Sequence, residues 1–155
     1  MATPVEQIQQ LMQELGPATP DIDAVVQTEE PSWAIQFSDE TIVIIEPAED
    51  PERMVLSAEL GSASDTLQLP IYETLLCYNL LWKDTGGVKM ALSGPGGELV
   101  LLYELFSANL TLNELQTVLS NFVSIAQIWT VYVTGESEQP GMPLPGSMDM
   151  LQLGA

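Results

Sequence analysis

Apolar residues recur with two different periods along this 155-residue chain, and the order of these periods limits the possible folds. A spacing of three or four residues is typical of a helix buried on one face, whereas a spacing of two is typical of a half-buried strand. Three helical segments alternate with two groups of strand-like segments. We therefore expect an α+β domain with helices packed against a twisted antiparallel sheet.

The first and last predicted helices carry recognisable start signals. Thr3 and Glu6 have the spacing of a capping box, and the apolar spacing that follows is expected to stop at residues 16–17, Gly-Pro. Thr111 opens the last helix, again with a glutamate three residues later, and the helical spacing continues to about Gly135. The first helix is short, and the last one has the longest apolar stripe in the chain.

The middle helix, expected from Pro70 to about Lys83, is apolar on two sides. One stripe contains Ile71, Leu75, Tyr78, Asn79 and Trp82, and the other contains Tyr72, Leu76 and Leu80. A surface helix needs only one apolar face, so two faces imply burial on both sides and favour contact with a second subunit. Cys77 lies in the same helix and is expected to be a small core residue, because the chain has no histidine to activate its thiol.

Five segments are expected to be strands of the sheet. They are residues 32–37, 41–46 and 54–60, and then a hairpin of 88–92 and 99–105 around a glycine-rich turn. The segment 41–46 is apolar on both faces and is expected to be covered on both sides. Residues 17–31 carry proline and acidic residues and are expected to be mainly loop. Residues 1–134 are thus expected to form one domain, followed by a flexible tail at 135–155 that is rich in proline, glycine and methionine.

Composition excludes several classes of function. Twenty-two acidic residues face three basic ones, and the formal net charge of −19 repels nucleic acid and anionic membranes. No histidine is available as a general base or metal ligand, and the acidic cluster at residues 46–52 lacks the spacing of a calcium loop. From this sequence we expect no signal peptide, no membrane span and no internal disulfide. We expect a cytoplasmic binding protein that is not an enzyme and has no cofactor or metal.

A groove for a polypeptide partner is the remaining candidate site. Apolar residues of the first helix and of the first predicted strand could line it, and an exposed strand edge could add backbone hydrogen bonds. The candidate partner-binding residues are Val5, Ile8, Met12, Trp33, Ile35 and Phe37. The alternative is that these side chains simply fill the core, since alternation in a strand usually serves the core.

Four stretches of the chain resemble a known protein family. They are residues 75–82 (Leu-Leu-Cys-Tyr-Asn-Leu-Leu-Trp), 86–92 (Gly-Gly-Val-Lys-Met-Ala-Leu), 97–105 (Gly-Glu-Leu-Val-Leu-Leu-Tyr-Glu-Leu) and 122–129 (Phe-Val-Ser-Ile-Ala-Gln-Ile-Trp). Their order and spacing are similar to those of the class I chaperones of type III secretion, the Tir chaperone (CesT-like) family. The resemblance covers about residues 3–134.

The resemblance implies an α-β-β-β-α-β-β-α order and a homodimer. Its two-fold contact would contain Leu76, Leu80 and Met90. By the same resemblance, the dimer would bind the N-terminal segment of a secretion effector, keep it soluble, and release it to the secretion ATPase complex without using nucleotide itself. An alternative on the same fold is a regulatory adaptor that sequesters a regulator protein, because fold alone does not decide function.

Overall fold

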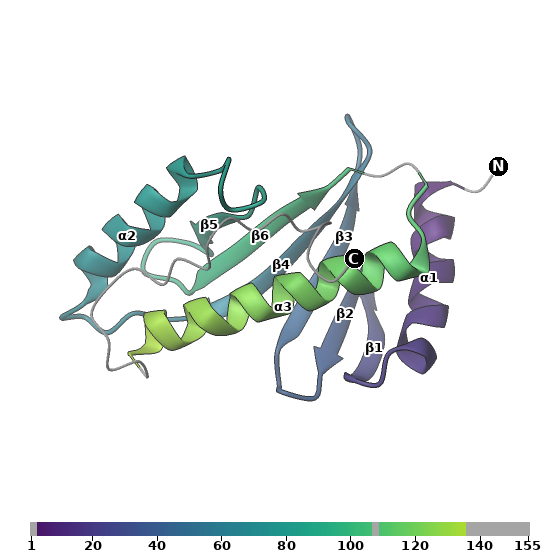
Figure 1. The fold of residues 1–155 in the computed structure, drawn as a ribbon, viewed down its shortest axis with the longest axis horizontal. Coiled ribbons are helices and arrows are strands. Elements are labelled where there is room, and N and C mark those ends of the chain that lie inside the picture. Colours follow the sequence, from purple (N-terminus) through teal and green to yellow (C-terminus); the bar gives the residue numbers. More distant parts are fainter. Residues whose placement is uncertain (1–2, 107–108, 136–155) are drawn as a thin grey trace.

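A six-stranded antiparallel sheet with helices along one face forms the domain (Figure 1). The structure, a computed structural model, describes residues 3–106 and 109–135. In chain order the elements are α1 (Pro4–Ala18), β1 (Ile22–Glu29), β2 (Ser32–Phe37), β3 (Ile42–Ala48), β4 (Arg53–Gly61), α2 (Gln68–Leu80), β5 (Lys89–Leu92), β6 (Leu99–Leu105) and α3 (Leu112–Thr134). The predicted α+β class is confirmed.

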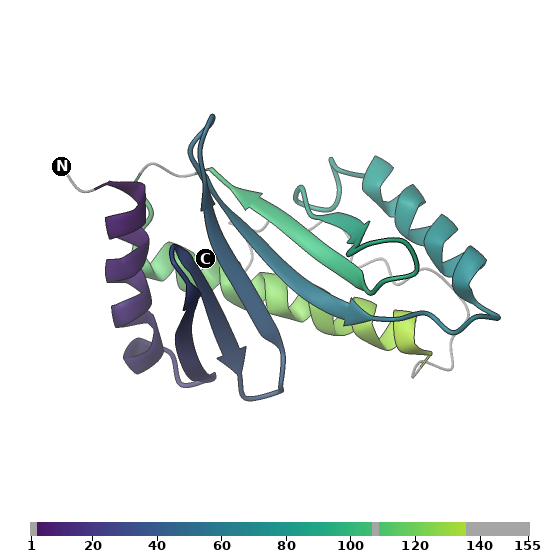
Figure 2. The same ribbon diagram turned by 180° about the vertical axis from the view of Figure 1, so that it is seen from behind.

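The strands follow the order β1-β2-β3-β4-β6-β5, and every neighbouring pair is antiparallel. Helix α3 runs across one face, where it contacts β4 and β6, while α1 packs near β1 and α2 packs near β5 (Figure 1). The view from behind shows β3 and β4 crossing in front of α3, with no helix of the described chain across this opposite face (Figure 2). One face of the sheet is therefore covered and the other is open.

The core lies between α3 and the covered face of the sheet. The buried residues of α3 are Leu115, Val118, Leu119, Phe122, Val123, Ile125, Ala126, Trp129 and Val133. Trp129 is fully buried and contacts the ring of Tyr78 edge-on, with 4.6 Å between ring centroids. Aromatic pairs in this geometry contribute about 0.5–1.5 kcal/mol beyond their buried area, so this contact holds α2 against the C-terminal half of α3.

The capping box predicted for the first helix is complete, and Thr111 caps α3 through one hydrogen bond. The backbone N–H of Glu6 donates to Thr3 Oγ1 (3.2 Å), and the N–H of Thr3 donates to Glu6 Oε2 (2.8 Å), which completes the capping box. The N–H of Glu114 donates to the hydroxyl of Thr111 (3.1 Å) at the start of α3. At the end of α3, Gly135 adopts a left-handed conformation with φ of 76°, which glycine accepts without a steric cost. Helix α1 continues to Ala18, one residue beyond its expected stop signal at residues 16–17.

The prediction that residues 17–31 form mainly loop is wrong, because Ile22–Glu29 form strand β1 at the edge of the sheet. An edge strand has a partner on one side only and needs few buried residues. Ile22 is buried and Val25 is partly buried, but Val26 is 55% exposed and acidic residues flank the segment. Because most residues of this segment are polar, its short alternation of apolar residues did not indicate a strand in the sequence. The tail predicted at 135–155 lies outside the described residues apart from Gly135.

The prediction that 41–46 is covered on both sides is also wrong. Val43 and Ile45 are fully buried beneath the helices, whereas Ile42 is 49% exposed. Ile42 and Ile44 point to the open face of the sheet, because successive side chains of a strand alternate between its two faces. The open face thus carries apolar side chains without a covering helix in the described chain.

Candidate functional site

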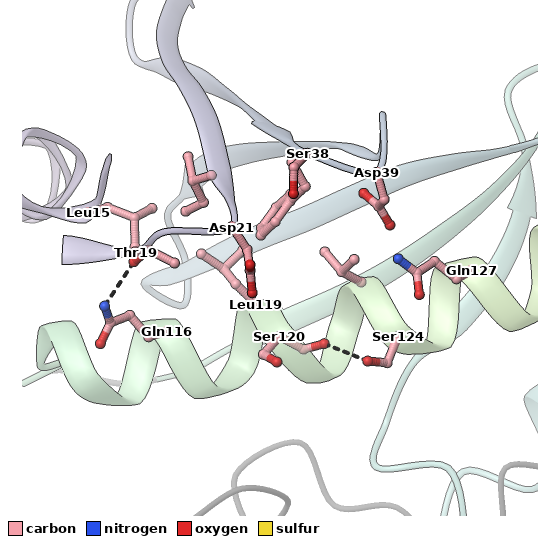
Figure 3. A pocket seen from close by; sticks show the side chains of 13 residues that line it. Leu15, Thr19, Asp21, Ser38, Asp39, Gln116, Leu119, Ser120, Ser124 and Gln127 are labelled. Carbon is pink, nitrogen blue, oxygen red and sulfur yellow. Dashed lines mark hydrogen bonds between the residues drawn. The ribbon is translucent and has the colours of Figure 1, made fainter. Parts of the chain in front are cut away.

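A pocket of about 230 Å³ opens between the end of α1, the β1 and β2 ends, and the middle of α3 (Figure 3). Its lining residues are Leu15, Thr19, Asp21, Ile22, Phe37, Ser38, Asp39, Gln116, Leu119, Ser120, Val123, Ser124 and Gln127. This volume is below the roughly 300–1,000 Å³ typical of small-molecule sites. The pocket suits one or two side chains of a polypeptide better than a cofactor.

The floor of the pocket is apolar. It is formed by buried side chains of the core, namely Leu15, Ile22, Phe37, Leu119 and Val123. One end is closed by Gln116, whose amide Nε2 donates to Thr19 Oγ1 (2.8 Å) and to the backbone carbonyl of Ala18 (3.1 Å). These two hydrogen bonds fix the segment after α1 to α3, so the wall of the pocket is held in place by polar contacts.

The rim of the pocket is polar and acidic. Asp21 and Asp39 come from the segments flanking β1 and β2, and Ser120, Ser124 and Gln127 come from the exposed side of α3 (Figure 3). No lysine or arginine lines the pocket. An apolar floor beneath a carboxylate rim favours an apolar side chain that is flanked by a cation.

Most of the predicted partner-binding residues do not form an open groove. Ile8, Met12 and Ile35 are at most 2% exposed and belong to the core, so these three side chains present no surface to a partner. Phe37 is also buried, at 6% exposed, but it lines the floor of the pocket. Val5 is 36% exposed and Trp33 is partly buried, and neither lines the pocket. Ile8, Met12 and Ile35 therefore lie where the alternative interpretation, that these side chains fill the core, places them.

The polar rim was missed because its members come from three separate parts of the chain. One signal in the sequence could have found part of it. Ser120, Ser124 and Gln127 have the spacing i, i+4, i+7, which places them on one side of a helix. They interrupt the apolar residues of α3 along the strip that meets the pocket. The positions of Asp21 and Asp39 depend on tertiary structure and had no local signal.

Helix α2 carries the second candidate surface. It buries Ile71, Leu75 and Tyr78, and burial raises the pKa of the Tyr78 phenol. Its other side and the residues that follow it expose large apolar side chains, namely Leu69 (68%), Leu76 (70%), Leu80 (79%) and Trp82 (61%). Monomeric proteins rarely expose a large contiguous apolar patch unless it binds something. We call the group Leu69, Leu76, Leu80 and Trp82 the α2 face.

The predicted dimer residues lie in two environments. Leu76 and Leu80 are exposed on the α2 face, whereas Met90 is 6% exposed. Leu76 and Met90 meet in a shallow pocket of about 180 Å³ between α2 and the β5–β6 hairpin, and Leu80 does not line it. Cys77 is exposed, so its predicted core position is wrong. Because α2 has two apolar stripes, the sequence did not indicate which side of this helix would face the sheet.

Asn79 fixes α2 to the edge of the sheet. Its side-chain Nδ2 donates to the backbone carbonyl of Met90 (3.0 Å), and its Oδ1 accepts from the Met90 N–H (2.7 Å). A single amide therefore satisfies both backbone groups of one β5 residue. This contact places α2 beside β5, while the side chains of the α2 face remain more than half exposed.

Residues 3–106 and 109–135 contain no group of three or more histidine, cysteine, aspartate or glutamate side chains that could hold a metal ion. Within those ranges, no helix has the length and apolar character required to cross a membrane.

Comparison with known proteins identifies the family. The model of the Tir chaperone protein (CesT) family matches residues 7–130. A chain in the crystal structure of the ExsC–ExsE complex has a TM-score of 0.69 at 21% identity, over 86% of this chain and 98% of that one. A chain in the structure of the HopA1–SchA chaperone–effector complex has a TM-score of 0.63 at 13% identity, over 84% and 98%. These two likenesses show the fold alone.

No curated protein sequence matches significantly. Because the family model spans most of the chain, the protein belongs to the Tir chaperone protein (CesT) family.

Proposed function

We propose that the protein is a cytoplasmic, homodimeric chaperone of a type III secretion system. It binds the N-terminal segment of a secreted effector, keeps that segment extended and soluble, and passes it to the secretion ATPase complex. Membership of a chaperone family supports this proposal, and so does the likeness to a chain of a chaperone–effector complex. The chaperone holds its client through binding alone and uses no nucleotide.

The observation that carries the proposal is the pocket between α1 and α3. It has an apolar floor, and its rim holds Asp21 and Asp39, so it suits an apolar side chain on an otherwise polar, cationic segment. Extended polypeptides are commonly recognised by pockets that take alternate side chains. Phe37 is the predicted partner-binding residue that would contact the client here.

The proposed dimer uses the α2 face. Leu76 and Leu80 would be buried against a second copy, and Met90 would support the contact from beneath Leu76. Homodimer interfaces are more apolar than ordinary protein surface, which fits this composition. In this arrangement each copy keeps its own pocket accessible, because the pocket lies between α1 and α3 at the opposite end of the sheet (Figures 1 and 3).

Affinity purification of the tagged full-length chain from its native bacterium tests the proposal. We expect light scattering to give a dimer carrying one other protein, with cross-links mapping the contact to that protein's N-terminal segment. Ser124→Trp, which places a bulky side chain at the pocket mouth, should reduce capture. Asn113→Trp adds the same side chain to an exposed position of α3 outside the pocket and should not.

The same purification separates the alternatives. Capture of a transcriptional regulator in place of an effector would favour the regulatory adaptor. A monomer that carries no partner would contradict both. Capture that is equal for the wild type and Ser124→Trp would show that the client binds elsewhere.

A further inference from the structure

Strands β3 and β4 separate at one end of their pairing. The last paired residues are Ile44 and Ser57, although β3 begins at Ile42 and β4 continues to Gly61. Beyond that point β3 pairs only with β2, and β4 pairs only with β6. The sheet therefore forks, and the two diverging strands can be followed from either side (Figures 1 and 2).

The fork contains a groove of about 690 Å³. It is lined by Asp39, Glu40, Thr41, Ile42, Ile44, Ser57, Ala58, Glu59, Val100 and Thr130. Thr130 belongs to α3, so the groove reaches through the sheet toward the helix layer. The groove is also adjacent to the pocket described above, because Asp39 lines both.

Both sides of the fork are strand edges. The segment from Ala58 to Gly61 has β6 on one side and no strand on the other, and Ile42 has only β2. Such edges carry backbone donors and acceptors that can pair with an added strand. Added strands are a recurring mode of peptide recognition, with alternate side chains pointing to opposite faces of the sheet.

The rim of the groove is acidic and has no cation of its own. Asp39, Glu40 and Glu59 line it. A hydrogen bond to the Glu98 carboxyl, together with repulsion by it, raises the pKa of Glu59. All three basic residues of the chain lie elsewhere: Arg53 and Lys89 are paired with Glu104, and Lys83 lies over the ring of Trp82. A cation for these carboxylates has to come from another molecule.

We propose that the β3–β4 fork receives an extended segment of the partner protein in which basic and apolar residues alternate. This inference rests on the proposed function and specifies the chemistry of the client. Basic side chains point toward the acidic rim that Asp39, Glu40 and Glu59 form, and apolar side chains point inward toward Ala58 and Thr130. The segment continues past Asp39 into the pocket between α1 and α3.

The first test measures binding of a fluorescein-labelled ten-residue peptide of alternating valine and lysine to the full-length chain, by fluorescence anisotropy near physiological ionic strength. Glu59→Lys should weaken binding roughly tenfold or more, because it places a like charge opposite lysine. Glu52→Lys changes the net charge equally at an exposed turn outside the groove, and should change affinity less than about threefold. Equal losses for the two variants would overturn the proposal.

A second pair of variants guards against misfolding of Glu59→Lys. Val100→Lys introduces a cation into the groove, whereas Val55→Lys introduces one on the same open face, between Glu46 and Glu104. Val100→Lys should weaken binding and Val55→Lys should not. A peptide of alternating lysine and proline, which keeps the charge but lacks half of the backbone N–H donors, should bind at least tenfold more weakly. Equal binding of the two peptides would exclude strand addition.

Amide hydrogen exchange identifies the residues of the protein that the peptide contacts. Saturation with the valine–lysine peptide should slow exchange of the amides in Ala58–Gly61, and unchanged exchange there would contradict the fork as the site. Client capture with the same variants then separates the two proposals. If wild type and Glu59→Lys capture an effector equally, the chaperone function stands and the fork proposal fails. If Ser124→Trp captures it as well as the wild type while Glu59→Lys does not, the pocket assignment fails alone.

Discussion

Helices α1 and α2 lie at opposite ends of the sheet and differ in how they use their apolar residues (Figure 1). In α1 the apolar stripe beyond the first turn is buried: Ile8, Leu11, Met12 and Leu15 are all at most 9% exposed, and only Val5 at the start is exposed, at 36%. In α2 three residues are buried, but Leu69, Leu76 and Leu80 are at least 68% exposed. Most of the apolar surface of α1 is thus buried within one chain, whereas a large part of that of α2 is exposed.

The difference shows that amphipathicity and apolar content carry separate information. A helix with one apolar stripe indicates which of its sides packs on the chain's own core. A helix that is apolar on two sides indicates an additional contact, because burying the second side stabilises the contact by about 25 cal/mol for each Å² of apolar surface removed from water. The predictions that follow test this contrast between the two helices.

Leu80→Asp should have the largest effect and convert the proposed dimer completely to monomer, because it places a charge in the centre of the α2 face. Multi-angle light scattering measures the mass. Val5→Asp makes the same chemical change at an exposed valine of α1 and should leave the mass unchanged. A dimeric Leu80→Asp variant would show that the α2 face is not the subunit contact.

Met12→Ala should lower the free energy of unfolding by about 2–5 kcal/mol, because it leaves a cavity at a position that is 2% exposed. Urea denaturation at several protein concentrations gives the value. The cost of Met12→Ala should not depend on protein concentration. That of Leu76→Ala should, since its contact is made between subunits. If the loss in free energy of unfolding depended on protein concentration in the same way for both variants, the proposed difference between α1 and α2 would be contradicted.

Asn79→Ala should cost about 1–3 kcal/mol, because it removes the partner of both backbone groups of Met90. Amide hydrogen exchange of Met90 should accelerate in parallel. Asn113→Ala, at an exposed position of α3, is the matched control. If Met90 exchanges at the wild-type rate in Asn79→Ala, the two hydrogen bonds do not hold α2 to β5.

Thr3→Ala should have the smallest effect, about 1 kcal/mol, through loss of the capping box at the start of α1. Helix α2 has no side-chain hydrogen bond at its N-cap, Leu67. Leu67→Ala should therefore show no loss attributable to a cap. Thermal unfolding measures the stability of both variants. A larger loss of stability for Leu67→Ala than for Thr3→Ala would contradict the expectation that the cap of α1 contributes more than the N-cap position of α2.

Much of the fold follows from local signals in the sequence. The strand predicted at 32–37 has the bounds of β2, and both predicted helix starts have their capping hydrogen bonds. These features depend on residues a few positions apart, which is why the sequence predicts them. β1 was missed because an edge strand requires only Ile22 to be buried, so its pattern is weak.

The candidate site could be predicted only in part, because it depends on contacts between distant segments. Phe37 was predicted, but its neighbours in the pocket include Asp21 and Gln116, which come close only when α3 crosses the sheet. The fork depends on where β3 and β4 stop pairing, and no residue type marks that position. The exposure of Cys77 likewise depends on which side of α2 meets the sheet.

The Asn79 amide also governs how the sheet can grow. β5 is an outer strand, and in an antiparallel pair the N–H and C=O of one residue point to the same side. By bonding both groups of Met90, Asn79 occupies the outward edge at that residue as a neighbouring strand would. Open strand edges are the usual starting points of aggregation. The α2 end of the protein can therefore display an apolar face at high concentration without offering the edge of β5 at Met90 to the strand of another molecule.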